Sequence, residues 1–128
     1  MDSGVLFVSP HPQDASSLAQ LLDDISLPLV HALGLKDAAS KLETGNFQVV
    51  LTEATLEDGT WLDILQLARA TNTELVVTHP WADARFWAEA INLGAYDLLA
   101  QPFFKGEVRR VLASAAGRKP AVAAHAAA

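Results

Sequence analysis

The chain has 128 residues, of which 51% are hydrophobic and 19% charged, and its formal net charge is −6. That length suits one domain with a packed core, and the ratio of hydrophobic to charged residues excludes a disordered chain. The absence of cysteine excludes disulfides and thiolate metal sites, and the lack of a basic stripe argues against a nucleic-acid surface. No apolar run approaches the ~20 residues of a membrane span, and no signal peptide is visible, so we expect a cytoplasmic protein without membrane contact.

Short apolar runs alternate along the chain with stretches that have one apolar helical face. Strands are expected at residues 5–8, 27–31, 47–52, 75–78 and 97–100, with helical stripes over 18–25, 35–42, 61–68, 87–94 and 108–115. Strict alternation of this kind predicts an α/β fold of (βα)5 type, in which a doubly wound parallel sheet has helices on both faces. We therefore expect one flavodoxin-like sheet of five strands.

Helix ends and the domain boundary can also be predicted. Thr60 and Asp83 are expected helix N-caps, and Gly45 and Gly94 stand where helices should end. After Gly117 the sequence becomes rich in alanine and contains a proline, which predicts a frayed end or a linker. The sequence thus indicates one domain over 1–117 followed by a tail over 118–128.

Ligands of an open parallel sheet bind beyond the carboxyl ends of its strands, at the point where the strand order reverses. In this chain the residues expected there are polar or proline, and they end or follow the first, third, fourth and fifth predicted strands. They are Ser9, Pro10, Glu53, Thr78 and Gln101. These five residues form the candidate pocket.

At these positions the chain resembles the receiver domain of bacterial two-component response regulators, over roughly residues 4–116. In that family the first strand ends in an acidic pair, where SPHP stands here, and the third ends in a phosphate-accepting aspartate, where Glu53 precedes ATLEDGTW. The fifth strand ends in Lys-Pro-Phe, matched by QPF after GAYDLL. The resemblance implies a CheY-like sheet with strand order 2-1-3-4-5, a role in phosphorelay signalling, and a cis bond before Pro102.

The departures from the family pattern bear on the chemistry. A complete receiver site gathers three carboxylates and a lysine, and its net charge of about −2 needs a divalent cation with several oxygen ligands. Here Ser9 and Pro10 supply no carboxylate and Gln101 supplies no charge, so Glu53 is alone. We expect no Mg²⁺ site, no cofactor and no enzymatic activity, and interpret the chain as a degenerate receiver.

Several readings of the pocket remain open. Glu53 is either an ordinary solvated side chain or a partial imitation of the phosphorylated state, because a carboxylate carries about one negative charge against −1.5 to −2 for a phosphate. Thr78 is an ordinary strand-end residue or a hydroxyl donor to Glu53, and Gln101 would hydrogen-bond to Glu53 across the pocket. Leu98 takes the position of the family's switching aromatic residue, so that half of the switch is expected to be absent.

Two histidines flank the predicted pocket. His11, His79 and Glu53 would suit a metal ion, but they lack a close-spaced ligand motif. Ser9, His79 and Glu53 would make a hydrolase triad, but the chain has no G-x-S-x-G elbow. Both histidines are otherwise expected to be exposed loop residues.

Aromatic residues suggest where a protein partner would bind. Trp81 lies in a predicted loop and Phe86 one position off the apolar stripe that contains Trp87, so Trp81 and Phe86 would be exposed anchors unless they fold back into the domain. They lie near the surface made by the predicted helix over 87–94, strand 97–100 and helix over 108–115, which is also a possible homodimer interface. The leading interpretation is a phosphorylation-independent signalling module that binds a protein. The alternative is a flavodoxin-like domain that binds a small molecule or nucleotide, against which the lack of a Gly-rich loop after the first strand counts.

Overall fold

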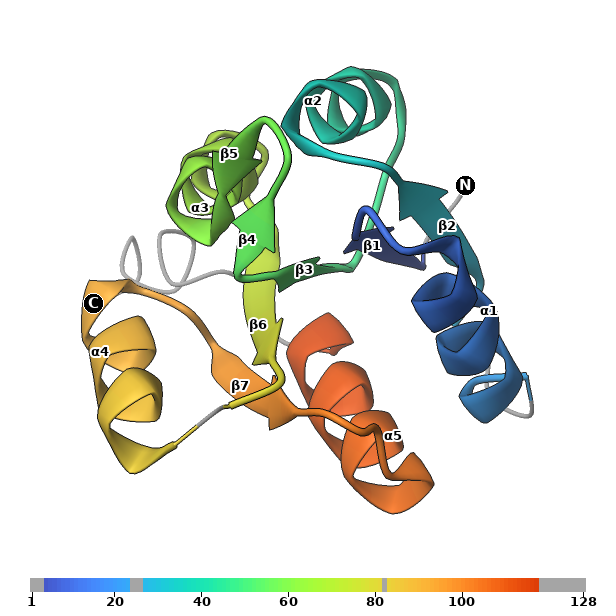
Figure 1. The fold of residues 1–128 in the computed structure, drawn as a ribbon. Helices are drawn as coiled ribbons and strands as arrows, with labels where there is room; N and C mark the ends of the chain where they lie inside the picture. Colours follow the sequence, from blue (N-terminus) through green and yellow to red (C-terminus); the bar gives the residue numbers. More distant parts are fainter. Residues whose placement is uncertain (1–3, 24–26, 82, 118–128) are drawn as a thin grey trace.

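The computed structural model describes residues 4–23, 27–81 and 83–117. Within these ranges, strands and helices alternate as the sequence predicts, with one additional hairpin (Figure 1). The elements are β1 (Val5–Val8), α1 (Pro12–Leu21), β2 (Leu29–Ala32), α2 (Leu35–Thr44), β3 (Val49–Glu53), β4 (Thr55–Leu56), β5 (Gly59–Thr60), α3 (Trp61–Ala70), β6 (Glu74–His79), α4 (Ala84–Leu93), β7 (Asp97–Ala100) and α5 (Lys105–Ala116).

The main sheet has five parallel strands in the order β2-β1-β3-β6-β7. Because β4 and β5 form a separate two-stranded hairpin, this order is the predicted 2-1-3-4-5, and the expected fold class is confirmed. The hairpin itself was not predicted. It shortens the loop between β3 and α3, where ATLEDGT reads as an unstructured turn because two-residue strands carry no detectable alternation.

Helices α2, α3 and α4 cover one face of the sheet, and α1 and α5 cover the other (Figure 1). Successive strand side chains alternate between the two faces, so that Leu6 and Val50 pack toward the first layer while Phe7 and Leu51 pack toward the second. All four side chains are fully buried. The apolar runs of β1, β3 and β6 are thus the centre of a three-layer domain, as expected for parallel strands covered on both faces.

The predicted helix ends at Thr60, Asp83, Gly45 and Gly94 are confirmed. Thr60 forms a capping box with Asp63 at the start of α3, and Asp83 accepts a hydrogen bond of 2.8 Å from the Phe86 N–H. Gly94 ends α4 with a φ of +123°, a conformation that residues with a Cβ rarely adopt.

Helix α2 has an N-cap supplied from elsewhere in the chain. Its own N-cap residue is Gly34, which has no side chain to offer. Asp58, from the turn between β4 and β5, accepts hydrogen bonds from the N–H groups of Leu35 at 2.7 Å and Lys36 at 3.0 Å. These bonds lower the pKa of Asp58 below its ordinary value of 3.8. The hairpin turn therefore ties the start of α2 to the loop that leaves β3.

The phase of α4 differs from the sequence prediction. Phe86 packs against the core beside Trp61, with ring centroids 6.2 Å apart. Trp87, in contrast, faces the solvent, and 48% of the residue is exposed. The predicted stripe joined Trp87 to Ala90; the buried stripe joins Phe86 to Ala90, since i and i+4 also share a face. The expectation that Phe86 is an exposed anchor is wrong, and so is the placement of Trp87 in the core.

The predicted stripe residue Ile25 and the predicted tail over 118–128 lie outside the described residues. None of the described helices combines the length and the apolar character that crossing a membrane requires.

Candidate functional site

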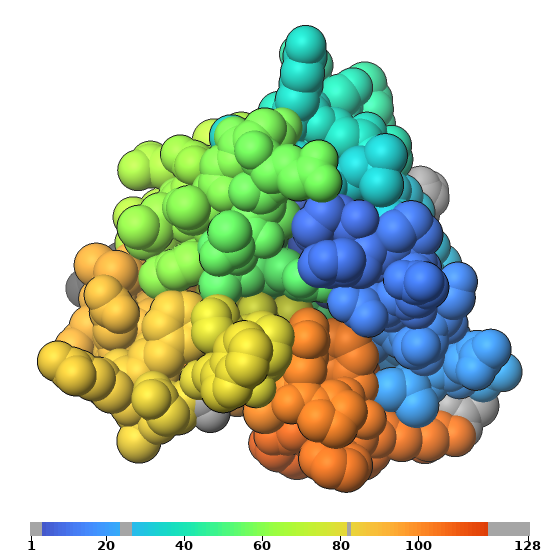
Figure 2. Space-filling model, viewed as in Figure 1, coloured from blue at the N-terminus to red at the C-terminus, as the bar shows by residue number. Residues whose placement is uncertain are grey.

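Four of the five predicted pocket residues are brought to the same side of the sheet. Ser9, Glu53 and Gln101 follow Phe7, Leu51 and Leu99 by two residues, so the alternation of β1, β3 and β7 directs them toward the α1 and α5 layer. Thr78 follows Val76 in the same way. Figure 2 shows the N-terminal segment in blue meeting green, yellow and orange segments on one face of the molecule. Strand register thus gathers four distant segments at one edge.

Glu53 is the centre of this site. Only 8% of the residue is exposed, so of the two readings of Glu53, that of an ordinary solvated side chain is wrong. The hydroxyl of Ser9, which is itself fully buried, donates a hydrogen bond of 2.5 Å to Glu53 Oε2. Because burying a carboxylate without partners is costly, this short bond supplies part of the compensation that its position requires.

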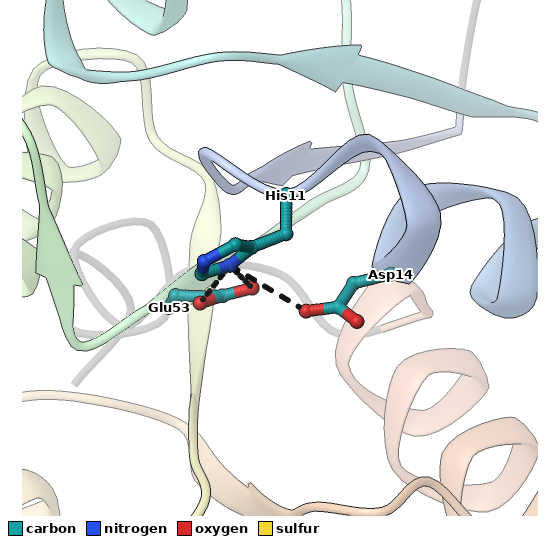
Figure 3. Close-up of side chains that lie close together, drawn as sticks. All are labelled: His11, Asp14 and Glu53. Atoms are coloured by element: carbon teal, nitrogen blue, oxygen red, sulfur yellow. Dashed lines mark hydrogen bonds and ion pairs between the residues drawn. The ribbon is translucent and has the colours of Figure 1, made fainter.

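His11 supplies the second partner of Glu53 (Figure 3). Its Nδ1 lies 3.2 Å from Glu53 Oε1 and 3.4 Å from Oε2, and 3.7 Å from Asp14 Oδ2. Since the carboxylates accept, Nδ1 carries the proton in this arrangement. Asp14 was not singled out from the sequence. The signal was available, because a histidine at the N-cap followed by proline at N1 places an aspartate three residues later on the same side of the first turn.

Ser9 is held in place by its neighbours in the chain and in the sheet. The His11 N–H donates to Ser9 Oγ at 2.9 Å, and His31 Nε2, in β2, lies 2.7 Å from the Ser9 carbonyl oxygen. A carbonyl oxygen only accepts, so His31 donates through Nε2. The hydroxyl of Ser9 therefore accepts a hydrogen bond from the backbone N–H of His11 and donates one to the Glu53 carboxylate.

Thr78 and Gln101 do not join this network. Thr78 Oγ1 and Gln101 Nε2 are buried without a hydrogen-bond partner among the described residues. The contacts of Glu53 with the Thr78 hydroxyl and the Gln101 amide, which the sequence left open, are therefore not formed. Glu53 lies between β1 and β6, and its carboxylate turns to the β1 side, where Ser9 and His11 offer donors.

The remaining predicted site residues occupy the surroundings of this network. Pro10 is partly exposed beside Ser9, and the Gln101–Pro102 peptide is cis. Leu98 is 8% exposed and packs in the core layer of α2, α3 and α4. A leucine held in that layer has no polar group to move between the interior and the solvent.

His79 lies apart from Glu53. Its Nδ1 accepts a hydrogen bond of 2.9 Å from the Trp81 N–H, and its ring packs against Phe86 with centroids 5.0 Å apart. The grouping of His11, His79 and Glu53 around a metal, which the sequence only weakly suggests, is therefore not formed, because His79 contacts Trp81 and Phe86 instead. The triad of Ser9, His79 and Glu53 also fails, because Ser9 donates its hydroxyl proton to a carboxylate and has no imidazole base.

The comparisons with known proteins point in one direction. No family model matches the chain. The response regulator protein PilR of Pseudomonas aeruginosa is 28% identical over 112 residues, covering 86% of this chain and 25% of PilR. The signal receiver domain of a LuxO repressor protein from Vibrio parahaemolyticus has a TM-score of 0.82 at 19% identity, with 91% of each chain covered. This chain has the CheY-like receiver fold. The beryllofluoride-activated receiver domain dimer of NtrC4 superposes on this chain with a TM-score of 0.80 at 22% identity, covering 90% of this chain and 96% of that one.

The hollows of this surface do not single out the strand ends as a small-molecule site. A cavity of about 330 Å³ adjoins the site and is lined by residues of α1 and by Gln101, Pro102 and Phe103. Hollows of about 600 and 620 Å³ lie elsewhere, along α5 and at the start of α2. Since ligand pockets usually span about 300–1,000 Å³, the strand-end cavity is at the small end of that range. The receiver comparisons do not favour the flavodoxin-like alternative either.

Proposed function

We propose that this receiver domain signals without being phosphorylated and without catalysing a reaction, by presenting a fixed surface to a protein partner in the cytoplasm. A receiver of a two-component response regulator is a signalling module, and PilR, which is about four times as long as the matched part, is one such regulator. The proposal concerns what this particular receiver does with an altered pocket. The chain spans a quarter of that relative, so the activity of PilR as a whole is not transferred to it.

The observation that carries the proposal is the state of the Glu53 carboxylate. It stands where the family resemblance places the phosphate acceptor, and the Ser9 hydroxyl and the His11 imidazole already occupy it. An attacking acceptor oxygen must be free to meet a phosphoryl group in line, with cations that neutralise the developing charge. Gln101 brings no cation to the pocket, and Thr78 makes no contact with the carboxylate. Neither Gln101 nor Thr78, the residues at the family's lysine and hydroxyl positions, therefore contacts the carboxylate.

The surface proposed for the partner is the one formed by α4, β7 and α5 together with Trp81. The side chains there include Trp81 at 78% exposed and Trp87 at 48%, and Phe104 at the start of α5 is 64% exposed. The Trp87 indole N–H donates a hydrogen bond of 3.2 Å to Asp97 Oδ1, and this bond links the outer side of α4 to β7. Large aromatic side chains are the usual anchors of protein interfaces. A second copy of the chain is the first partner to test, and the NtrC4 receiver is a dimer.

Phosphodonor labelling tests the first half of the proposal. The full chain is incubated with acetyl phosphate and Mg²⁺, and its intact mass is compared with that of a variant carrying Ser9→Asp, Pro10→Asp, Glu53→Asp and Gln101→Lys. We expect no acid-labile phosphate on the unaltered chain, and labelling of the rebuilt variant would show that the assay detects it. Stoichiometric labelling of the unaltered chain would refute phosphorylation independence.

Sedimentation equilibrium tests the second half. We expect a monomer–dimer equilibrium that Trp81→Ala and Trp87→Ala each weaken, whereas Leu33→Ala leaves it unchanged. Leu33 is a matched control because it is an exposed apolar residue, 57% accessible, beyond the end of β2 and far in the sheet order from β7. A monomer at all concentrations would exclude a second copy as the partner, and a loss of dimer with Leu33→Ala would place the interface elsewhere.

A further inference from the structure

We propose that His11, Asp14 and Glu53 bind a divalent transition-metal ion, with Zn²⁺ as the best fit, at the carboxyl edge of the sheet. One ligand atom from each residue lies within 4.8 Å of the other two (Figure 3). Imidazole and carboxylate groups together suit zinc and its neighbours, whereas Mg²⁺ prefers oxygen ligands alone. This ligand set includes a histidine and an α1 residue, and goes beyond the proposed signalling function.

The geometry of the three ligands is close to that of a bound ion. Zinc lies about 2.0–2.2 Å from nitrogen and oxygen ligands, so neighbouring ligands of a tetrahedral site are roughly 3.3–3.6 Å apart. His11 Nδ1 lies 3.2 Å from Glu53 Oε1 and 3.7 Å from Asp14 Oδ2. The ligand oxygens of Asp14 and Glu53 lie within 4.8 Å of each other, and the side chain of Asp14 is 40% exposed, which leaves it room to turn toward the other two ligands. A metal would thus replace the shared Nδ1 proton, which is released to water.

The three ligands are positioned by rigid elements. Glu53 ends the central strand β3, and its Oε2 is fixed by the Ser9 hydroxyl, which leaves Oε1 to face His11. His11 is the N-cap of α1 and Asp14 is in its first turn, with the Asp14 N–H bonded to the His11 carbonyl at 3.0 Å. A hydrogen bond that orients a ligating carboxylate is the usual support around a metal ligand.

The charge and the solvent access also fit a cation. With a neutral imidazole, the two carboxylates give the cluster a negative charge. In the ion pairs of the described residues, both Asp14 and Glu53 are paired with His11. A divalent ion would neutralise that charge. The side chain of His11 is 57% exposed, so water can complete the coordination, as in zinc sites with three protein ligands.

Zinc titration of the metal-free full chain against a chromophoric zinc indicator tests the proposal. We expect one saturable site per chain, weakened at least about tenfold by His11→Gln and by Asp14→Asn, and no displacement of zinc by millimolar Mg²⁺. The controls are His79→Gln, which changes a histidine bonded to Trp81 and not to Glu53, and His125→Gln, which changes a histidine outside the described residues. Both should bind zinc as the unaltered chain does. Circular dichroism of each variant checks that it is folded.

A second measurement separates coordination from simple charge attraction. In a long-range ¹H–¹⁵N spectrum, zinc should move the His11 Nδ1 resonance to the position of a metal-bound, deprotonated nitrogen and leave that of His79 in place. The proposal is overturned by the absence of saturable binding up to 1 mM Zn²⁺ (about the weak end of specific affinities), by equal weakening in His11→Gln and His79→Gln, or by an unshifted His11 resonance. Phosphodonor labelling is read separately, so the failure of the signalling proposal would leave this result unchanged.

Discussion

Replacing Thr78 by valine should make the protein more stable. The Thr78 residue is fully buried, and its hydroxyl has no hydrogen-bond partner among the described residues. A buried polar group without a partner costs about 1–3 kcal/mol, and valine has the same shape without that group. We therefore expect Thr78→Val to raise the free energy of unfolding by about 1–2 kcal/mol, which corresponds to roughly 4 °C in Tm for each kcal/mol in a domain of this size.

Thr52→Val is the matched control. Thr52 is also fully buried near the carboxyl end of a central strand, but its hydroxyl donates a hydrogen bond of 2.9 Å to the Glu53 carbonyl oxygen. Removing that bond should lower the free energy of unfolding by about 0.5–1.5 kcal/mol. The two variants make the same chemical change, so the difference in sign isolates the contribution of the hydrogen bond.

Urea unfolding followed by far-ultraviolet circular dichroism measures both variants. The midpoint should rise for Thr78→Val and fall for Thr52→Val, with the slope unchanged in each, because neither change alters the surface exposed on unfolding. If Thr78→Val lowers the midpoint as much as Thr52→Val does, the Thr78 hydroxyl has a partner in solution. The separation of Glu53 from the β6 side of the pocket would then be wrong.

Three further predictions follow from other parts of the structure. Glu53→Gln should shift amide resonances near β1 and the start of α1 but leave those of α4 and β7 in place, because the carboxylate contacts Ser9 and not the β6 side; shifts that spread across β7 would show that Glu53 acts as a phosphate mimic. The pKa of Asp58 is lowered in the folded state, so its contribution to stability is present above pH 3.8, its ordinary value, and is lost as the pH falls below that. Asp58→Asn should therefore reduce the difference between the free energies of unfolding in urea at pH 7 and at pH 3. The same difference in the variant as in the unaltered chain would exclude the effect. Gly94→Ala should lower the free energy of unfolding by about 1–2 kcal/mol, because its φ of +123° is a backbone conformation that residues with a Cβ rarely adopt; an unchanged urea midpoint would contradict this.

The central strands were predictable because they are buried on both faces. The expected range 5–8 coincides with β1, in which all four residues are buried. The edge strand β2, which is partly exposed, was expected at 27–31 and is found at Leu29–Ala32. The phase of α4 was not predictable from apolar spacing alone. Phe86 and Trp87 are adjacent and similarly apolar, so the choice between them depends on which ring finds Trp61 and His79 across the fold.

The pocket positions followed from strand ends, but the contacts inside the pocket did not. Alternation places Ser9, Glu53, Thr78 and Gln101 on one face, which sequence reasoning can supply. It does not say to which side a glutamate turns, because that depends on competing donors. His11 Nδ1 and the Ser9 hydroxyl are both on the β1 side, and this decides the outcome against Thr78.

The short bond between Ser9 and Glu53 has a consequence for how the sequence can change. Glu53→Asp alone would restore the acceptor type that the family resemblance assigns, but the shorter side chain would withdraw its carboxylate from Ser9 Oγ by roughly one carbon–carbon bond, about 1.5 Å. The buried Ser9 hydroxyl would lose its acceptor before any carboxylate or lysine had been added to hold a phosphoryl group. A series of single substitutions that begins with Glu53→Asp therefore begins with a loss of stability, unless Ser9 is changed first.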